Sequence, residues 1–291
     1  LPIEGRAANI IRSLFCSPNQ RISGNVSVTV ENNDSGSPIP EAPITYICGE
    51  DSCTLGQTDE RGEIVTRLPT CLNGELRVAK PGFISKNIIY NASVGKDSDL
   101  KIELSEIFTV NATVAKKNIA EIYSVAVATG TGVGISQQKY RALGLNETVL
   151  LTLQRIRETP GEDAFMQFIS FDNTTSETGA ELKLAKGKYE LFGSLIAERE
   201  IVIPERKISG GLQTITIPEI KLNPVFKGGV RLSNDTGGYF IVNSQILNLS
   251  KITYFVYESD DPKTYEELGA LGNIDGYSRY YRSALYPIAS K

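Results

Sequence analysis

The residues that could carry acid–base or metal chemistry in this chain are carboxylates, because its 291 residues include no histidine. A Ser-His-Asp or Cys-His catalytic centre, a His-ligated zinc site and a histidine pH switch therefore cannot be built. Neighbouring carboxylates in one loop could instead hold Ca²⁺. The candidate groups are Glu50 with Asp51, Asp97 with Asp99, and Glu258 with Asp260 and Asp261. None completes a D-x-D-x-D-G loop, so we favour solvated turn charge over calcium and expect no catalytic residue or cofactor.

Three other motifs are too incomplete or too common to indicate a reaction. Gly130–Gly134 has the spacing G-x-G-x-G without a Walker lysine, which favours a flexible or bulged connection over a nucleotide loop. Asp235–Gly237 matches the aspartic-protease triplet, but a second triplet is missing. Tyrosines near the end of the sequence could stack on carbohydrate, although packing on a sheet or at a subunit contact is their commoner use. These tyrosines are Tyr277, Tyr280, Tyr281 and Tyr286.

Eight N-x-[ST] sequons lie along the chain, roughly three times the number that its composition would give by chance. Their asparagines are Asn25, Asn33, Asn91, Asn111, Asn146, Asn173, Asn234 and Asn248. Asn, Ser and Thr are also common in turns and strand ends, which is the alternative explanation. We interpret the excess as N-glycosylation of an extracellular or cell-surface protein.

The four cysteines, Cys16, Cys48, Cys53 and Cys71, all lie in the first quarter of the sequence and form no C-x-x-C pair. An even number at such spacings favours disulfides over a zinc site. Disulfides persist in oxidising compartments. The cysteines and the sequons therefore predict the same extracellular location.

Charge and hydropathy narrow the partner classes. Lys and Arg number 30 against 34 Asp and Glu, a net charge of −4 that offers no basic surface for nucleic acid or an anionic membrane. The longest nearly apolar window, Ile122–Ile135, has about 14 residues, whereas a membrane-spanning helix needs about 20. We expect no membrane span within the sequence, and copies of the chain itself as the main partner.

The two ends of the sequence carry further expectations. Leu1 is not preceded by Met, which we interpret as removal of a signal peptide, and a removed anchor after Lys291 stays open. Ile3–Arg6 spells a factor Xa recognition sequence, whose natural origin also stays open. We interpret residues 1–20 as a docking segment, because Ile10, Ile11 and Leu14 could insert as a donated strand into a neighbouring molecule.

Between residues 22 and 104, short apolar runs alternate with turn-forming clusters. This pattern is typical of an antiparallel sandwich. Val26, Val28 and Val30 alternate with polar residues, so Asn25 and Ser27 should lie on the solvent-exposed face of the strand. The same reasoning places Asn111 and Thr113 on a wet face. Seven strands are predicted: Ile22–Val30, Ile44–Cys48, Thr54–Gln57, Glu63–Arg67, Glu75–Ala79, Lys86–Tyr90 and Leu100–Leu104.

This region resembles the carboxypeptidase regulatory-like, transthyretin-like β-sandwich. The matching segments are Gly24–Val26, Ile39–Ile44, Thr58–Ile64, Leu68–Pro69, Gly74–Val78 and Lys80–Phe83. Within them, Asp59 can cap a turn and Gly62 can supply a positive φ before the next strand. The resemblance covers residues 21–105 and implies a non-catalytic accessory or stalk domain without transferable active-site residues. Cys71 departs from the family pattern, which suggests a disulfide-stapled variant.

Two disulfide pairings are open. Antiparallel pairing of Ile22–Val30 with Ile44–Cys48, and a hairpin across Asp59–Gly62, would favour Cys16–Cys48 with Cys53–Cys71. The alternative is Cys48–Cys53 with Cys16–Cys71, in which the loop Gly49–Ser52 closes a local bridge.

Residues 106–291 predict a second, larger β-sandwich region, with a further division considered near residue 222. Its predicted strands are Phe108–Ala115, Ile122–Ala128, Thr148–Arg157, Ala164–Phe171, Glu181–Leu184, Tyr189–Ile196, Glu200–Ile203, Thr214–Ile217, Gly238–Val242 and Ile252–Tyr257. Two short helices are predicted, Ser136–Leu143 and Pro262–Leu271, the second capped by Asp260 and Asp261. The fold class is therefore all-β, with an N-terminal seven-stranded Ig- or transthyretin-like sandwich.

These features predict a non-catalytic, N-glycosylated structural protein, such as a subunit of a cell-surface filament or surface layer. The alternatives are an adhesive module that binds a carbohydrate or receptor, and an accessory domain of a secreted hydrolase.

Overall fold

The structure is a computed structural model that describes residues 14–118, 139–210 and 213–291. The chain is all-β, as predicted, and forms two compact units. Unit 1 comprises residues up to 107 together with 157–163, and unit 2 comprises 108–156 and 164–291. Residues 1–13 of the predicted docking segment lie outside the described residues, and residues 14–20 form two short 3₁₀ turns rather than a strand. The Gly130–Gly134 motif, Ile3–Arg6 and the strand Ile122–Ala128 also lie outside the described residues.

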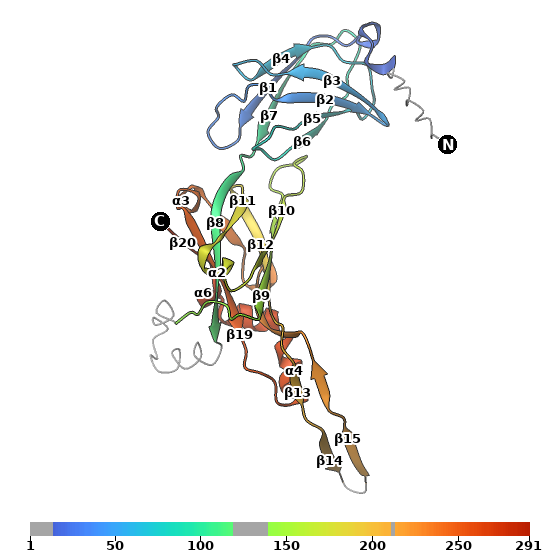
Figure 1. Cartoon of the computed structure of the whole chain (residues 1–291). Coiled ribbons are helices and arrows are strands. Elements are labelled where there is room, and N and C mark those ends of the chain that lie inside the picture. Colours follow the sequence, from blue (N-terminus) through green and yellow to red (C-terminus); the bar gives the residue numbers. More distant parts are fainter. Residues whose placement is uncertain (1–13, 119–138, 211–212) are drawn as a thin grey trace, which may run out of the picture. The chain divides into compact units, whose positions relative to one another are not determined.

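Unit 1 contains seven strands at the seven predicted positions, preceded by two short 3₁₀ turns (Figure 1). The 3₁₀ turns are η1 (Leu14–Cys16) and η2 (Pro18–Gln20). The strands are β1 (Val26–Asn32), β2 (Pro43–Cys48), β3 (Asp51–Gln57), β4 (Glu63–Thr66), β5 (Glu75–Val78), β6 (Lys86–Ile89) and β7 (Ser98–Leu104). They form a three-stranded sheet in the order β4-β1-β7 and a four-stranded sheet in the order β3-β2-β5-β6.

The pairing of β1 differs from the prediction. β1 pairs with β4 in antiparallel and with β7 in parallel orientation, whereas β2 belongs to the other sheet. The predicted pairing of Ile22–Val30 with Ile44–Cys48 is therefore wrong. The reason is that β1 and β2 are connected across the two sheets, so that both bury one face in the shared core.

Local signals in unit 1 are confirmed. Val26, Val28 and Val30 are fully buried in the core, while Asn25 is exposed. Asp59 caps the β3–β4 turn, because its carboxylate accepts hydrogen bonds from the amides of Arg61 and Glu63, each at 2.9 Å. Gly62 has φ of 73°, and a Cβ there would lie 2.6 Å from the carbonyl oxygen of Val30.

Residues 157–163 complete unit 1, although they follow β9 in the sequence. The amide of Asn87 donates to the Gly161 carbonyl at 2.7 Å, and the Ser105 hydroxyl donates to the buried carboxylate of Glu162 at 2.6 Å. This loop shows neither an apolar run nor a strand pattern, so nothing in the sequence indicated its place.

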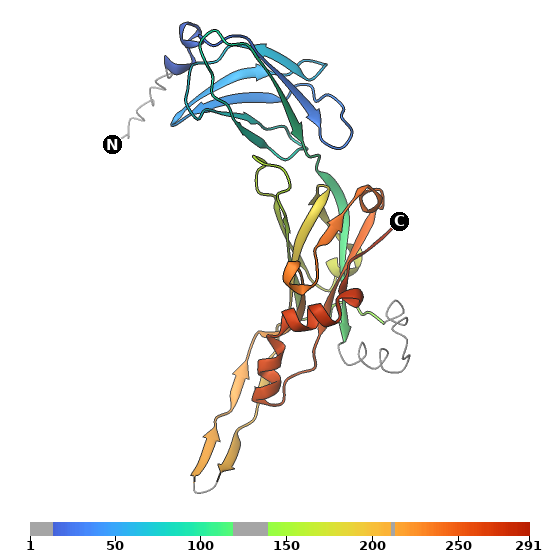
Figure 2. The same cartoon turned by 180° about the vertical axis from the view of Figure 1, so that it is seen from behind.

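Unit 2 is a larger sandwich (Figure 2). Its strands are β8 (Phe108–Asn118), β9 (Glu147–Arg155), β10 (Met166–Phe171), β11 (Ala180–Leu184), β12 (Gly187–Ala197), β13 (Ile201–Ile203), β14 (Arg206–Gly210), β15 (Gln213–Ile217), β16 (Ile220–Leu222), β17 (Val225–Leu232), β18 (Phe240–Val242), β19 (Lys251–Glu258) and β20 (Ile288–Ser290). One sheet has the order β10-β9-β12-β17, with β18 also on β12, and the other has the order β11-β8-β19-β20. The pairs β13–β16 and β14–β15 form separate two-stranded ribbons.

Short helices of unit 2 lie mostly towards the end of the sequence. The helical elements are α2 (Thr175–Thr178), η4 (Asn234–Thr236), α3 (Ser244–Leu247), α4 (Tyr265–Leu271), α5 (Ile274–Tyr280) and α6 (Arg282–Leu285). The predicted helix Pro262–Leu271 is α4, but its cap is Thr264, whose hydroxyl accepts from the Glu267 amide at 3.2 Å, rather than Asp260 or Asp261. The described part of the predicted helix Ser136–Leu143 is not helical, because Arg141 forms a β-bridge with Lys116.

The core of unit 2 is rich in aromatic side chains. Six of them are fully buried: Tyr189, Tyr254, Tyr257, Phe171, Phe240 and Phe255. The prediction that Thr113 is solvent-exposed is wrong, since Thr113 is 3% exposed and its hydroxyl lies 3.0 Å from that of Thr253. This happens because β8 is an inner strand between β11 and β19, and the hydroxyl finds its partner across the parallel β8–β19 pair.

Candidate binding surface and the predicted site residues

The outer face of the β10-β9-β12 sheet carries large apolar side chains. Alternation along β10 buries Phe171 and turns Met166 and Phe168 outwards, and alternation along β9 and β12 turns Leu150 and Phe192 outwards. The exposed fractions are 74% for Phe168, 46% for Leu150, 43% for Phe192 and 39% for Met166. We call these four residues the apolar face.

Strand register places the two phenyl groups of the apolar face on one line across the sheet. Phe168 of β10 is opposite Thr152 of β9, and Thr152 is opposite Phe192 of β12. Arg231 of β17 continues the line next to Phe192. Two strand spacings separate the phenyl-bearing positions, about 10 Å. Side chains of this kind usually face the core of a sandwich, and polar residues usually cover its outside.

A shallow groove of about 200 Å³ lies beside Phe192. Its polar walls come from Thr152, Gln154, Glu190 and Arg231. The Arg231 guanidinium is held 3.1 Å from the Asp275 carboxylate, which orients it at the edge of the groove. An aromatic side chain beside amide, carboxylate and guanidinium groups is a suitable setting for a polar ligand with an apolar surface.

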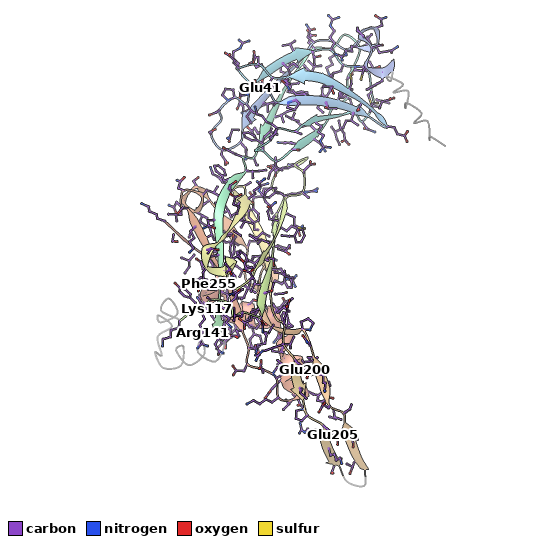
Figure 3. The ribbon with its side chains drawn as sticks, viewed as in Figure 1. Glu41, Lys117, Arg141, Glu200, Glu205 and Phe255 are labelled. Atoms are coloured by element: carbon purple, nitrogen blue, oxygen red, sulfur yellow. A yellow bond between two sulfur atoms is a disulfide. The ribbon has the colours of Figure 1, made fainter. Side chains whose placement is uncertain are left out.

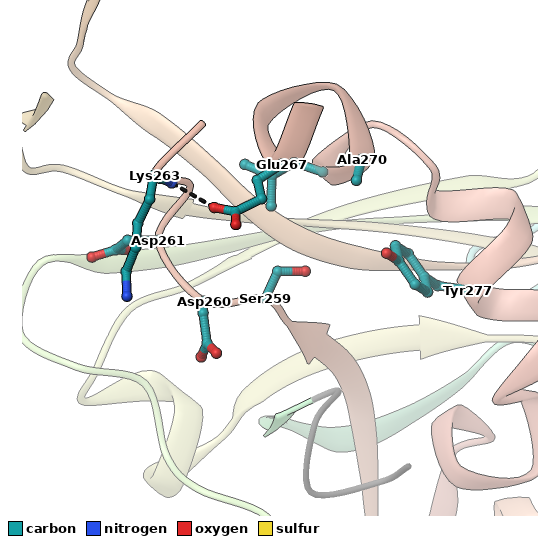
Figure 4. Close-up of a pocket in the computed structure, with 8 residues that line it drawn as sticks. Ser259, Asp260, Asp261, Lys263, Glu267, Ala270 and Tyr277 are labelled. Carbon is teal, nitrogen blue, oxygen red and sulfur yellow. Dashed lines mark hydrogen bonds between the residues drawn. The ribbon is translucent and has the colours of Figure 1, made fainter. Parts of the chain in front are cut away.

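The candidate calcium ligands near the end of β19 are engaged with protein groups instead of converging on one point. Glu258 accepts from Lys116 at 2.9 Å, and Asp261 accepts from the buried Lys227 and from Arg199. Asp260 and Asp261 line a pocket of about 280 Å³ that also contains Tyr277 and Glu267 (Figure 4). Among the described residues, no group of three or more Cys, Asp or Glu could hold a metal ion.

The Lys116 ammonium lies between two carboxylates at the same end of unit 2. It is 2.7 Å from Glu147 and 2.9 Å from Glu258, and all three side chains are less than 15% exposed. Burial alone would raise the pKa of Glu147, but hydrogen bonds from Lys116 and from the Gly144 amide outweigh burial, so the pKa lies below its ordinary value. The cluster is a compensated ion-pair network rather than an acid–base pair.

The neighbouring lysine on β8 has a different environment. Lys117 is 5% exposed, and its ammonium lies 3.8 Å from the centre of the Phe255 ring (Figure 3). It donates a hydrogen bond to the Ala284 carbonyl. Burial lowers the pKa of Lys117 to about 8. The sequence pattern did not identify this residue, because Lys116 and Lys117 look alike in a polar strand end.

The cysteines pair differently from both predicted schemes. Cys48 is bonded to Cys71, with 6.1 Å between their Cα atoms, and Cys16 and Cys53 are free thiols. Cys48 ends β2, which pairs with β5, and Cys71 lies just before β5. The β2–β5 neighbourhood therefore brings these two cysteines together. Both predicted schemes were wrong because they assumed that β2 pairs with β1, or that the β2–β3 loop closes its own bridge.

The remaining predicted residues are placed as follows. Seven sequon asparagines are exposed and Asn173 is half-buried, so glycosylation stays a prediction. Glu50, Asp51, Asp97 and Asp99 are exposed, and Asp97 accepts from the Asn25 amide at 2.7 Å. Thr236 of the Asp235–Gly237 triplet is fully buried and forms a capping box with Ser233, which is a structural use.

The tyrosine cluster is mainly a packing element. Tyr277, Tyr281 and Tyr286 pack against the core of unit 2, and only Tyr280, at 73% exposed, presents most of its ring to solvent. The Tyr280 and Tyr281 rings meet edge to face at 4.8 Å.

No family model matches the sequence, and no curated protein matches it. The resemblance of residues 21–105 to the carboxypeptidase regulatory-like domain stays a prediction. No helix within the described residues is long and apolar enough to cross a membrane.

Several solved structures are similar to the chain at low scores. A minor pilin from Streptococcus agalactiae has a TM-score of 0.32 and 10% identity, covering 83% of this chain and 98% of the pilin. A streptococcal ancillary pilin has a TM-score of 0.31 and 9% identity, covering 83% of this chain and 63% of that one. A Bacteroides uniformis protein provisionally described as carbohydrate-binding has a TM-score of 0.26 and 10% identity, covering 69% of this chain and 99% of that protein. Scores at this level carry no argument about function.

Proposed function

We propose that the chain is a non-catalytic, N-glycosylated extracellular protein that forms a structural surface assembly by association with further copies of itself. The apolar face carries this proposal. In an antiparallel sandwich, the outer face of a sheet is normally polar. Four large apolar side chains on one such face mark an interaction surface.

The charges around the apolar face favour a second copy as its occupant. Glu190 and Arg231 supply one negative and one positive charge beside Phe192. Two copies can therefore meet face to face without like-charge repulsion, and a carboxylate of one copy can approach a guanidinium of the other.

The β14–β15 ribbon is a second surface that supports association. Ile208 and Ile215 are directly opposite each other in register and are 41% and 63% exposed. A two-stranded ribbon gains little stability on its own. Contact with a neighbouring molecule would bury this pair and stabilise the ribbon.

Two covalent features support the proposed extracellular location. The Cys48–Cys71 disulfide and the exposed sequon asparagines suit an oxidising, secretory route. Glycopeptide mass spectrometry of the protein secreted from a eukaryotic host tests this part. Eight unmodified asparagines would contradict it.

The association part is tested by sedimentation over a wide concentration range at neutral pH. We expect the wild-type chain to form dimers or larger species, and Phe168→Ser with Phe192→Ser to shift the midpoint at least tenfold towards higher concentration. Val65→Ser with Ile89→Ser is the matched control, because Val65 and Ile89 are exposed apolar strand residues of unit 1. A wild-type chain that stays monomeric, or equal effects of the two double variants, would overturn the assembly.

A second function is favoured by the groove beside Phe192. Its amide, carboxylate and guanidinium groups could bind sugar hydroxyls while the phenyl group packs on a sugar ring. A glycan array separates the two functions. Binding that is lost in Gln154→Ala, in a chain that remains monomeric, would replace assembly by adhesion as the role of this face.

A further inference from the structure

The two free thiols of unit 1 are neighbours in space. Cys16 ends η1, and Cys53 is fully buried on β3. The Cys16 thiol donates to the carbonyl of Ser52, the residue before Cys53, at 3.0 Å. The Cys53 thiol is close enough to raise the pKa of Cys16. The Arg21 guanidinium lies 3.4 Å from the Cys53 sulfur.

Packing holds Cys16 at this position. The preceding residue, Phe15, stacks on the buried ring of Tyr46, with 6.2 Å between the ring centres. Phe15 and Cys16 both pack against the core of unit 1, to which Cys53 belongs. The two sulfurs are therefore kept together by the fold, so that their reaction needs no large rearrangement.

We propose that Cys16 and Cys53 form a second intramolecular disulfide that joins η1 to β3. The bond would lie on the same β2–β3 hairpin that carries Cys48. It would covalently attach the start of the described chain to its own unit, so that only residues before Cys16 could extend to a neighbouring molecule.

The reaction balances with a small-molecule disulfide such as oxidised glutathione as the oxidant. The Cys16 thiolate attacks one glutathione sulfur, forming a mixed disulfide and releasing one glutathione thiolate. The Cys53 thiolate then attacks the Cys16 sulfur and releases the second glutathione. Two protons leave the protein and two electrons pass to glutathione. Cys16 reacts first because it is partly exposed, whereas Cys53 is fully buried.

The environment of Cys16 sets the pH dependence of this reaction. Burial, followed by contact with Cys53, raises the pKa of Cys16 to about 11. Arg21 acts in the opposite direction, and Asp51 adds to the increase. Because the thiolate is the attacking species, the rate should rise about tenfold per pH unit between about pH 7 and 9.

Digestion with trypsin and a glutamate-specific protease tests the pairing. These enzymes place Cys16, Cys48, Cys53 and Cys71 on separate peptides, 13–21, 42–50, 51–60 and 68–75, and none of the four contains a sequon. After incubation with oxidised and reduced glutathione and alkylation, we expect 13–21 joined to 51–60 and 42–50 joined to 68–75. The joined pair should be two hydrogens lighter than its separate peptides.

Cys16→Ser is the matched variant. We expect it to lose the 13–21 linkage, retain the 42–50 linkage and remain folded, since Cys16 lies at the edge of the core. Three outcomes would overturn the proposal: an alkylated Cys16 after oxidation, Cys16 joined to 42–50 or 68–75, or Cys16 joined to a second chain on a non-reducing gel. The linkage of peptide 13–21 to peptide 51–60 requires neither assembly nor glycans, so a failure of the proposed function leaves this test unchanged.

Discussion

The two units differ in the interactions that stabilise their sandwiches. Among the largest fully buried side chains, unit 1 contributes one aromatic residue, Tyr46, and unit 2 contributes six. Unit 1 holds all four cysteines and the Cys48–Cys71 bond, and unit 2 holds none. A smaller domain buries a smaller fraction of its surface. A covalent link in unit 1 therefore supplies stability that a larger aromatic core supplies in unit 2.

Both units bury charged side chains, and the buried lysines differ in their partners. The β8 strand of unit 2 carries the nearly buried lysines Lys116 and Lys117, and β17 carries Lys227 at 2% exposed. Lys116 and Lys227 are compensated by carboxylates, whereas the described partners of Lys117 are a ring and a carbonyl. Unit 1 also buries a lysine, Lys86, which is 9% exposed and donates to the Glu103 carbonyl at 3.3 Å. Lys117 is the more deeply buried of the two, at 5% exposed, and its ammonium is held there at a cost in stability.

The largest expected effect is a cavity in the aromatic core. Phe171→Ala should lower the free energy of unfolding of unit 2 by about 3–5 kcal/mol, because Phe171 is fully buried. Phe168→Ala is the matched control on the same strand and should change it by less than about 0.5 kcal/mol. Urea unfolding followed by peptide-resolved hydrogen exchange measures both. Equal losses from the two variants, or a loss confined to unit 1, would contradict the conclusion that unit 2 is stabilised by its aromatic core.

The next effect should be confined to unit 1. In a Cys16→Ser background, replacing Cys48 and Cys71 by alanine should cost about 2–4 kcal/mol, because the bond closes a loop with a sequence separation of 23. Hydrogen exchange should accelerate in peptides of unit 1 and stay unchanged in unit 2. A reductant should remove the difference between this variant and its background. Persistence of the difference under reduction would assign the loss to packing rather than to the bond.

The strands were predictable where their signals are local. Alternating valines and the turn Asp59–Gly62 locate β1 and β4 within a few residues, because side-chain period and turn chemistry depend on near neighbours. Strand pairing depends on distant residues. The parallel β1–β7 pair was not predicted, and the cysteine pairing failed with it.

The apolar face could not be located from the sequence for a related reason. β10 carries apolar residues on both faces, with Phe168 outside and Ile169 and Phe171 inside, so alternation does not say which face is buried. Helix α5 had a detectable signal in its cap, since the Asn273 side chain accepts from the Gly276 amide at 3.1 Å. The residues that follow lack an apolar stripe, so their pattern does not predict a helix. Their tyrosines suggested carbohydrate stacking instead.

The smallest of the three effects is the free-energy cost of burying the Lys117 ammonium, and it depends on pH. Its pKa is about 8 in the folded protein and near 10.5 when exposed, so the unfolded chain binds more protons between these values. Stability of unit 2 should therefore rise as pH increases through 8, and the burial penalty is present in full only below that pH. Between about pH 7.5 and 9.5 the gain relative to Lys117→Met should be about 2 kcal/mol.

The Lys117→Met comparison removes the contribution of other titrating groups. Tyr257 has a raised pKa because of burial, which opposes the gain only above the ordinary tyrosine pKa near 10. Lys101→Met serves as the exposed control, since Lys101 lies on β7 of unit 1 with its side chain 57% exposed. Chemical denaturation at each pH gives the three curves. If wild type and Lys117→Met run parallel through this range, the ammonium is not desolvated, and the contrast between the two cores rests on aromatic packing and the disulfide alone.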